Sequence, residues 1–270
     1  MGARKLAGCA LALALSGCGE EFPSRTTIED YRVLGIAADH PELPADGAAT
    51  VQVFDVEPDD RPVAYTWSLC FLSYGAVDGY RCADPALEVA LDATGPALHL
   101  DFGPDGYDFR ALYAAYGPFY APDGHPLTLE EGVEVYVKLT SGPAGGKRVE
   151  TVKRLRLRDA DEAPNTNPAI EALDVEALEG EATGPRTVRL RARIDPAAEQ
   201  TFVDPLTGAE RTEELLLTWY TTRGSLDPGL TYGATRQTTL TAPAEPGPTR
   251  VFVAVRDGRG GLSVAEAQVP

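Results

Sequence analysis

The chain has 270 residues and a formal net charge of −17, with 27 glycines, 22 prolines and four cysteines. So acidic a surface repels phosphate backbones and anionic lipid head groups, which argues against nucleic acid as a partner and against electrostatic membrane binding. The length suffices for two domains of ordinary size. Glycine and proline spread along the whole chain favour an all-β protein, with many short strands joined by turns.

The N-terminal segment has the three parts of an export signal. Two basic residues, Arg4 and Lys5, precede the apolar run 6–15, and small residues then lead into Cys18. The run is too short to cross a bilayer as a helix, which takes about 20 apolar residues. Leu15-Ser16-Gly17-Cys18 resembles the lipobox of bacterial lipoproteins. The resemblance implies cleavage before Cys18, a diacylglyceryl group on its sulfur and an acyl chain on its new amine.

An ordinary signal peptide, cleaved after Ala14, is the alternative. That cleavage would leave Cys18, Cys70 and Cys82, an odd number of cysteines in an oxidising compartment. Lipid attachment to Cys18 leaves a single pair. We therefore expect residues 1–17 to be a lipoprotein signal peptide.

The resemblance also indicates where the protein resides. Two or more acyl chains anchor a protein stably to a membrane, whereas one chain holds it only marginally. The residue after the cysteine is Gly19 and not the aspartate that retains many lipoproteins at the inner membrane. We expect a protein of the cell envelope, held at the outer membrane by its lipid, with residues 18–27 as a lipidated tether.

Residues 28–160 show the alternation typical of a β-sandwich. Apolar and polar side chains exchange at every position within several stretches, as expected where one face of a strand is buried. A glycine-rich connection, 141–146, predicts a hairpin between the last two stretches. The expected strands are 31–37, 50–56, 63–70, 133–138 and 149–157.

Between these strands lies an insert, 71–131, that shows no regular period apart from a short predicted helix at 108–116 with Asp108 as its N-cap. It holds ten of the 21 aromatic residues. Exposed aromatics would make a binding surface. Alternatively, the insert needs a small core of its own and the aromatics supply it, which is the interpretation we favour. The candidate binding residues are Tyr107, Tyr113, Tyr116, Phe119 and Tyr120.

Cys70 and Cys82 are predicted to form a disulfide at the base of the insert. Export removes them from reducing thiols, and they are the pair left once Cys18 is lipidated. Gly75 and Gly79 between them let the chain double back. A zinc site is the competing use, but the spacing does not suit a Cys-x-x-Cys knuckle.

Residues 161–168 are acidic and proline-containing and predict a linker to a second domain at 169–270. The stretch 187–194 alternates most regularly, with a row of arginines on its polar face, which we expect to offset the acidic surface. Further strands are expected at 170–177, 215–222, 251–255 and 262–269.

The two halves repeat one plan. Tyr65-Thr66-Trp67 matches Leu217-Thr218-Trp219, and each is followed by a valine-alternating strand and a terminal hairpin. The pattern resembles the immunoglobulin-like (Ig-like) modules of bacterial surfaces, in which a tryptophan fills the core between two sheets. The segment 257–261 is similar to the last turn of modules of the polycystic-kidney-disease type. The resemblance implies two tandem Ig-like antiparallel β-sandwiches, the first with a long irregular, disulfide-bearing insert.

Reactive motifs are missing from the sequence. It has no His-Glu-x-x-His, no Gly-x-Ser-x-Gly and no phosphate-cradling glycine loop, and its three histidines lie far apart. We therefore expect no catalytic residues, no cofactor and no enzyme.

Calcium is the one metal that the sequence suggests. Five residues with hard oxygen ligands lie near the domain boundary, in a stretch loosely similar to the calcium-binding linkers of cadherins. A merely solvated linker is the competing interpretation, which we favour. The candidate ligands are Asp159, Asp161, Glu162, Asn165 and Asn167.

Two classes of function follow. The first is a non-catalytic lipoprotein that presents Ig-like domains to an envelope protein or a glycan, or braces an envelope assembly. The second is a carbohydrate-binding accessory subunit or degenerate enzyme that uses the aromatic insert.

Overall fold

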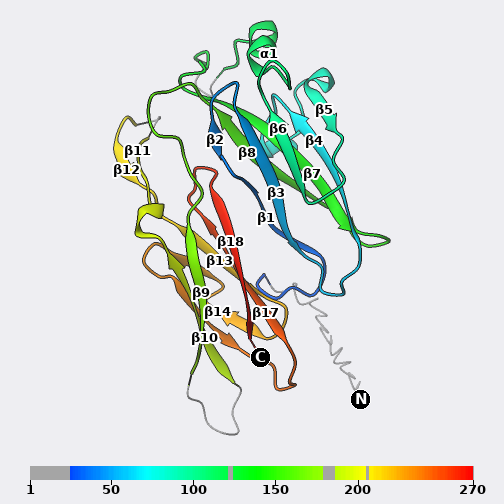
Figure 1. Ribbon diagram of the computed structural model, residues 1–270, viewed down its shortest axis with the longest axis vertical. Coiled ribbons are helices and arrows are strands. Elements are labelled where there is room, and N and C mark those ends of the chain that lie inside the picture. Colours follow the sequence, from blue (N-terminus) through cyan, green and yellow to red (C-terminus); the bar gives the residue numbers. More distant parts are fainter. Residues whose placement is uncertain (1–24, 121–123, 179–185, 205–206, 270) are drawn as a thin grey trace, which may run out of the picture.

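The computed structural model describes residues 25–120, 124–178, 186–204 and 207–269. These residues form two β-sandwiches that follow one another along the long axis of the molecule (Figure 1). Strands make up most of the regular structure, and Cys70 and Cys82 are joined by a disulfide. The predicted class, two tandem Ig-like sandwiches with a disulfide-bearing insert, is confirmed.

The first sandwich packs a three-stranded sheet against a five-stranded sheet. The alternation that predicted its strands is seen in their burial, because every second side chain over most of β3 and β7 faces the core. The smaller sheet has the order β1 (Arg32–Ala38), β3 (Ala48–Val56), β6 (Ala97–Asp101). The larger has the order β2 (Glu42–Leu43), β8 (Val149–Leu157), β7 (Val133–Pro143), β4 (Val63–Cys70), β5 (Glu88–Leu91).

The second sandwich consists of two four-stranded sheets and a small ribbon. One sheet has the order β14 (Ser225–Asp227), β16 (Gln237–Thr241), β10 (Thr187–Ile194), β9 (Ile170–Ala177). The other has the order β15 (Leu230–Tyr232), β13 (Leu216–Thr221), β17 (Thr249–Arg256), β18 (Leu262–Val269). The ribbon pairs β11 (Thr201–Val203) with β12 (Glu210–Thr212).

The repeated plan is present in three dimensions. Trp67 on β4 and Trp219 on β13 are both fully buried between the sheets of their sandwich. Each indole N–H is satisfied, Trp67 Nε1 by the carbonyl of Gly95 at 2.9 Å and Trp219 Nε1 by Thr231 Oγ1 at 3.0 Å. A buried tryptophan with a paired N–H fixes the centre of each core, since it brings a large apolar area without an unsatisfied donor.

The predicted insert is more regular than expected. Its strands β5 and β6 are the edge strands of the two sheets of the first sandwich, so only the segments around them stand outside the sheets. The sequence pattern does not predict β5 and β6, because a strand of four or five residues gives too short an alternation to recognise. The insert also holds the expected helix, α1 (Phe109–Tyr116), whose N-cap Asp108 accepts from the Ala111 amide at 3.1 Å. Three short 3-10 turns occur in the described residues, at Ala76–Asp78, Pro85–Leu87 and Pro196–Ala198.

The last residues of the predicted tether contact the second sandwich. The Thr221 amide donates to the Thr26 carbonyl at 2.9 Å, and the Ile28 amide donates to the Thr221 carbonyl at 2.7 Å. Residues 26–28 therefore run beside the end of β13 before the chain enters the first sandwich. The rest of the predicted tether, 18–24, lies outside the described residues, as does the signal segment. The described end of the predicted tether thus contacts the second sandwich before the chain enters the first.

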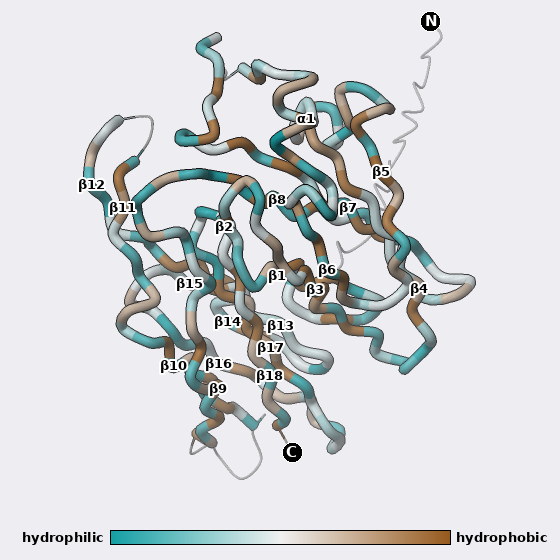
Figure 2. Tube along the Cα trace, turned by 45° about the horizontal axis from the view of Figure 1, so that its top comes forward, coloured by the Kyte–Doolittle hydropathy of each residue, from teal (hydrophilic) through white to brown (hydrophobic). Residues whose placement is uncertain are grey.

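The two sandwiches share a small apolar core at their junction. Ile28, Leu34, Val56 and Phe252 are each at most 4% exposed and pack together, with β1 and β3 on one side and β17 on the other. Figure 2 shows hydrophobic stretches of β1, β17 and β18 where the sandwiches meet. Burying these side chains holds the domains together, because apolar area removed from water contributes about 25 cal/mol per Å².

Candidate functional site

The predicted linker is part of a buried polar contact between the domains. Asn165 is 2% exposed, and its Nδ2 donates to Asp257 Oδ2 at 2.9 Å. Asn167 Nδ2 donates to the Ala38 carbonyl in the first sandwich at 2.6 Å, and its Oδ1 accepts from the Leu262 amide in the second at 2.9 Å. The expectation of a solvated linker is therefore wrong for these two residues, because Asn165 bonds the Asp257 carboxylate and Asn167 bonds backbone groups of both sandwiches in place of water.

Asp257 holds the turn that the first sandwich contacts. Its carboxylate accepts from the amides of Arg259 at 2.7 Å and Gly261 at 2.9 Å. From the first sandwich, buried Lys153 on β8 donates through Nζ to the Gly260 carbonyl in the same turn. Burial lowers the pKa of Lys153 to about 8, although the nearby Asp257 carboxylate opposes that shift.

Two buried glutamates, one from each sandwich, fix the arginines beside this turn. Arg259 Nη1 lies 2.9 Å from Glu213 Oε1, and its Nη2 lies 3.7 Å from Glu42 Oε2. Arg158 Nη1 lies 3.3 Å from the other oxygen of Glu42. Glu42 and Glu213 side chains are 7% and 1% exposed, and burial raises the pKa of Glu213 against the opposing effect of a backbone hydrogen bond and of Arg259. The network holds these guanidinium groups in place across the junction.

A groove of about 630 Å³ lies over this network, and we call it the junction groove. Both sandwiches and the β11–β12 ribbon contribute to it. One wall carries Phe202, whose ring has the Arg259 guanidinium 4.5 Å above its centroid. Its basic lining residues are Arg154, Arg156, Arg158 and Arg259, its acidic ones Glu134, Glu162 and Glu210. Clefts between domains are among the places where ligand sites preferentially occur.

Arg156 differs from its neighbours in the groove. Its Nη2 donates to the Glu131 carbonyl, and within the described part of the chain no carboxylate lies within ion-pair distance of it. Burial lowers the pKa of Arg156, Glu42 and Glu134 oppose the shift, and the positive charges of Arg158 and Arg259 add to it. A half-buried cation without a paired anion favours an anionic ligand beside it.

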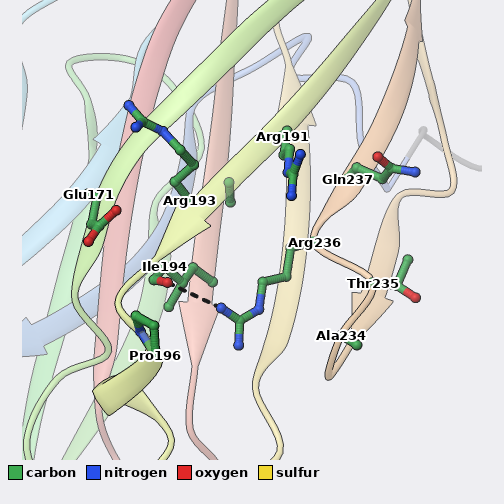
Figure 3. Close-up of a pocket in the computed structure, with 10 residues that line it drawn as sticks. Glu171, Arg191, Arg193, Ile194, Pro196, Ala234, Thr235, Arg236 and Gln237 are labelled. Carbon is green, nitrogen blue, oxygen red and sulfur yellow. Dashed lines mark hydrogen bonds between the residues drawn. The ribbon is translucent and has the colours of Figure 1, made fainter.

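A second hollow, of about 640 Å³, lies on the outer face of the second sandwich and is shown in Figure 3. Its arginines are largely occupied. Arg236 Nη1 donates to the Ile194 carbonyl at 3.3 Å, the dashed line in Figure 3, and its Nη2 donates to Glu199 at 2.9 Å. Arg193 pairs with Asp174 at 2.9 Å. This hollow is an open part of the exposed sheet face, so we take the junction groove as the better candidate site.

The candidate aromatics of the insert divide into two groups. Phe119 is 4% exposed and Tyr107 and Tyr113 are partly buried, and all three pack against the core of the first sandwich. Tyr113 and Phe119 meet edge to face at 5.5 Å. Tyr116 and Tyr120 remain 52% and 63% exposed. The structure therefore places three of the five in packing positions and leaves two at the surface.

The calcium candidates face different partners. Asp159 pairs with Arg110 at 2.7 Å and accepts from the Ala45 amide at 3.0 Å, whereas Glu162 pairs with Arg158 at 2.5 Å. Asp161 is exposed, and the two asparagines bond as described above. No group of three or more His, Cys, Asp or Glu side chains in the described ranges is arranged to hold a metal ion. The five residues are not brought together, and calcium binding stays a prediction.

The two cysteine predictions have different outcomes. The Cys70–Cys82 disulfide is confirmed, with its Cα atoms 5.7 Å apart, and it ties the end of β4 to the base of the insert. Cys18 lies outside the described residues, so lipid attachment stays a prediction. In the part of the chain that the structure describes, no helix has the length and apolar character needed to span a membrane.

Sequence reasoning missed the residues of the junction groove. A usable signal was present, since Arg154, Arg156 and Arg158 alternate with the buried Leu155 and Leu157 along β8 and its end. The row on 149–157 has the same period as the arginine row on the strand 187–194, which is expected to offset the acidic surface. Neither pattern shows that the second sandwich lies opposite β8. The contact between Lys153 and the Gly260 carbonyl joins residues about a hundred positions apart along the chain.

The geometry of the chain itself defines a protein of two tandem Ig-like β-sandwiches. No protein-family model matches it, and no curated protein does. Similar solved structures include the D0-D1 domain of intimin (14% identity, TM-score 0.24, 87% of this chain and 97% of that one). Others are three N-terminal domains of the Hoc protein of bacteriophage RB49 (13%, 0.24, 88% and 58%) and the FN1–FN3 domains of chicken CNTN1 (8%, 0.23, 88% and 64%). At such TM-scores these likenesses carry no argument about function.

Proposed function

We propose that this protein is a lipid-anchored, non-catalytic lipoprotein of the bacterial cell envelope, at the outer membrane, which binds a partner protein in the groove between two rigidly joined Ig-like domains. The observation that carries the proposal is the junction itself. An apolar cluster, the hydrogen bonds of Asn165 and Asn167 and the Glu42–Arg259–Glu213 network fix the relative orientation of the sandwiches. A groove with fixed walls binds at a lower entropic cost than one that must first be ordered.

The anchor in this proposal rests on the lipobox resemblance at Cys18. Native protein purified from its own envelope should have a mature N-terminus at Cys18 that carries acyl chains, as measured by mass spectrometry. A free amine at Leu15 would contradict the lipoprotein assignment and leave the binding proposal intact.

The partner is to be captured from the same envelope by cross-linking and mass spectrometry. The test variant is Val203→Asp, which places a charge in the groove at a side chain that is 62% exposed, so folding is not disturbed. The matched control is Val77→Asp, at an exposed valine (98%) in the insert. We expect Val203→Asp to lose a partner that wild type and Val77→Asp retain. Equal recovery with all three proteins would show that binding does not use the groove.

A second candidate function has one observation in its favour. Tyr116 and Tyr120 are exposed on the insert, where aromatic faces could stack on sugar rings of a glycan. A glycan array probed with the mature protein tests this role. Binding that disappears in Tyr116→Ala or Tyr120→Ala, and persists in Val203→Asp, would favour the carbohydrate-binding function over the junction groove.

A further inference from the structure

The arginines of the junction groove repeat with a period of two. Arg154, Arg156 and Arg158 project from alternate positions along β8 and its end, and all three line the groove. Alternate side chains of a strand lie about 6.6 Å apart on one face, and so do alternate side chains of any extended peptide. We propose that the groove binds an extended acidic peptide segment whose carboxylates, at alternate positions, pair with Arg156 and Arg158. This inference rests on the proposed function and names the chemistry of the partner.

Arg156 is the central contact in this arrangement. Its guanidinium is half-buried and bonded to the Glu131 carbonyl, which leaves its remaining donors without a carboxylate among the described residues. A guanidinium presents parallel N–H groups that match the two oxygens of a carboxylate. Such a pair is stronger in a partly desolvated groove than in water, since less solvent screens it.

Arg158 offers a second contact, because a ligand carboxylate can displace one of the two glutamates with which Arg158 pairs. The buried Glu42 holds one side of its guanidinium at 3.3 Å, and Glu162 pairs with the other side at 2.5 Å. The Glu162 side chain is 69% exposed, so it returns to water at little cost, because exposed ion pairs contribute at most about 1 kcal/mol. A peptide carboxylate would take the place that Glu162 now occupies.

The small ribbon explains why a peptide, and not a glycan or a free phosphate, is the expected ligand. β11 and β12 pair only with each other in the described structure, so each keeps an unpaired edge. β11 contributes Thr201, Phe202 and Val203 to the groove lining. An extended peptide can add to a free strand edge through main-chain hydrogen bonds. The exposed Val203 side chain offers an apolar contact to the side chains between the acidic ones.

The overall charge of −17 does not oppose this local attraction at physiological salt. Charges in solvent are screened over about 8 Å at that ionic strength, so the charged groups of the groove itself, four arginines and three glutamates, determine the field that a bound carboxylate experiences. Binding should therefore weaken as salt is raised, because the contacts are ion pairs near the surface.

The experiment is calorimetric titration of the mature chain with a short capped peptide of alternating glutamate and threonine. A second peptide has the same composition with its glutamates in one block, and polygalacturonate and inorganic phosphate are the other probes. We expect the alternating peptide to bind about tenfold more tightly than the block peptide, and the other two probes not to compete with it. Arg156→Gln should weaken binding about tenfold or more, since a hydrogen bond to a charged group is lost.

Two further variants keep the test decisive. Arg191→Gln, on the outer face of the second sandwich, is the matched control and should bind as wild type does. Arg154→Gln, at an exposed side chain, should weaken binding by a smaller factor. It replaces Arg156→Gln as the test variant if Arg156→Gln does not fold. Any of four results would overturn the inference. The alternating peptide fails to bind, or it binds no more tightly than the block peptide. Polygalacturonate or phosphate competes with it, or Arg191→Gln weakens binding as much as Arg156→Gln does. A partner still captured through Val203 in the envelope experiment would then leave the proposed function standing.

Discussion

Asn165 Nδ2 donates a 2.9 Å hydrogen bond to Asp257 Oδ2 across 92 positions of the sequence, and this bond joins the segment between the domains to the last turn of the second sandwich. Asp257 in turn holds the backbone that Lys153 of the first sandwich contacts. The predicted flexible linker is therefore a structural element of the junction. The following predictions test how the junction and the two cores are held.

Asn165→Ala should loosen the junction. The variant removes one buried hydrogen bond, but it also removes Asn165 Oδ1, a buried oxygen without a partner in the described structure. We therefore expect a loss of about 1 kcal/mol in the free energy of unfolding, at the low end for a buried polar pair. Small-angle scattering should show a wider range of inter-domain orientations. Asp161→Asn, at an exposed position of the same segment, is the control and should change neither measurement.

Phe252→Ala should uncouple the two sandwiches. Phe252 is 4% exposed in the apolar cluster that both domains share, and truncating a buried phenylalanine costs about 3–5 kcal/mol. Calorimetry should then show two unfolding transitions where the wild type shows one, because the shared cluster no longer links the domains. Tyr232→Ala, at a 54% exposed ring of the second sandwich, should keep a single transition. A single transition in both variants would contradict the role of the cluster.

Stability should depend on pH through Lys153. The pKa of this buried amine is lowered to about 8 in the folded protein, so the unfolded chain binds more protons than the folded one above that pH. The free energy of unfolding should therefore rise with pH from 8 to about 9.5, by about 1–2 kcal/mol relative to Lys153→Met. The upper limit keeps Tyr136 and Tyr65 protonated in the folded protein, since burial raises the pKa of each to about 12.

Chemical denaturation of wild type and Lys153→Met across this pH range measures the free energy of unfolding of each protein. The two stabilities should diverge as pH rises, with the wild type gaining relative to the variant. Parallel curves would show that the amine is not held in a desolvated position. Lys147→Met, at an exposed lysine of the β7–β8 turn, is the matched control and should follow the wild type.

Replacing Cys70 and Cys82 together by serine should loosen the insert and spare the second sandwich. A disulfide closing a loop of this length, with a sequence separation of 12, contributes about 2–4 kcal/mol, chiefly by restricting the unfolded chain. Hydrogen exchange should rise in residues 71–91. The strands of the second sandwich, where no cysteine lies, are the internal control. Uniform exchange across both sandwiches would mean that the disulfide supports the whole molecule.

The sequence by itself determined the class of fold and much of its local structure. Period-two alternation marks the buried face of strands such as β3, β7 and β10, because a strand turns every second side chain to the core. Asp108 predicted the start of α1 for an equally local reason, since a cap bonds to an amide three residues away. Cysteine number and an export signal were enough to predict the Cys70–Cys82 pair.

Only the tertiary structure decided the site. Alternation states which face of β8 is exposed, but not that the turn 257–261 lies against Lys153 or that Glu42 and Glu213 meet at Arg259. The Arg256 side chain reaches the Leu34 carbonyl at 2.6 Å over 222 positions, and no local pattern encodes so distant a partner. For the same reason the sequence predicts Asn165 and Asn167 as residues of a solvated linker or as calcium ligands, and not as contacts between the domains. Their contacts follow from how two separate cores pack together, which depends on the shape of both surfaces at once.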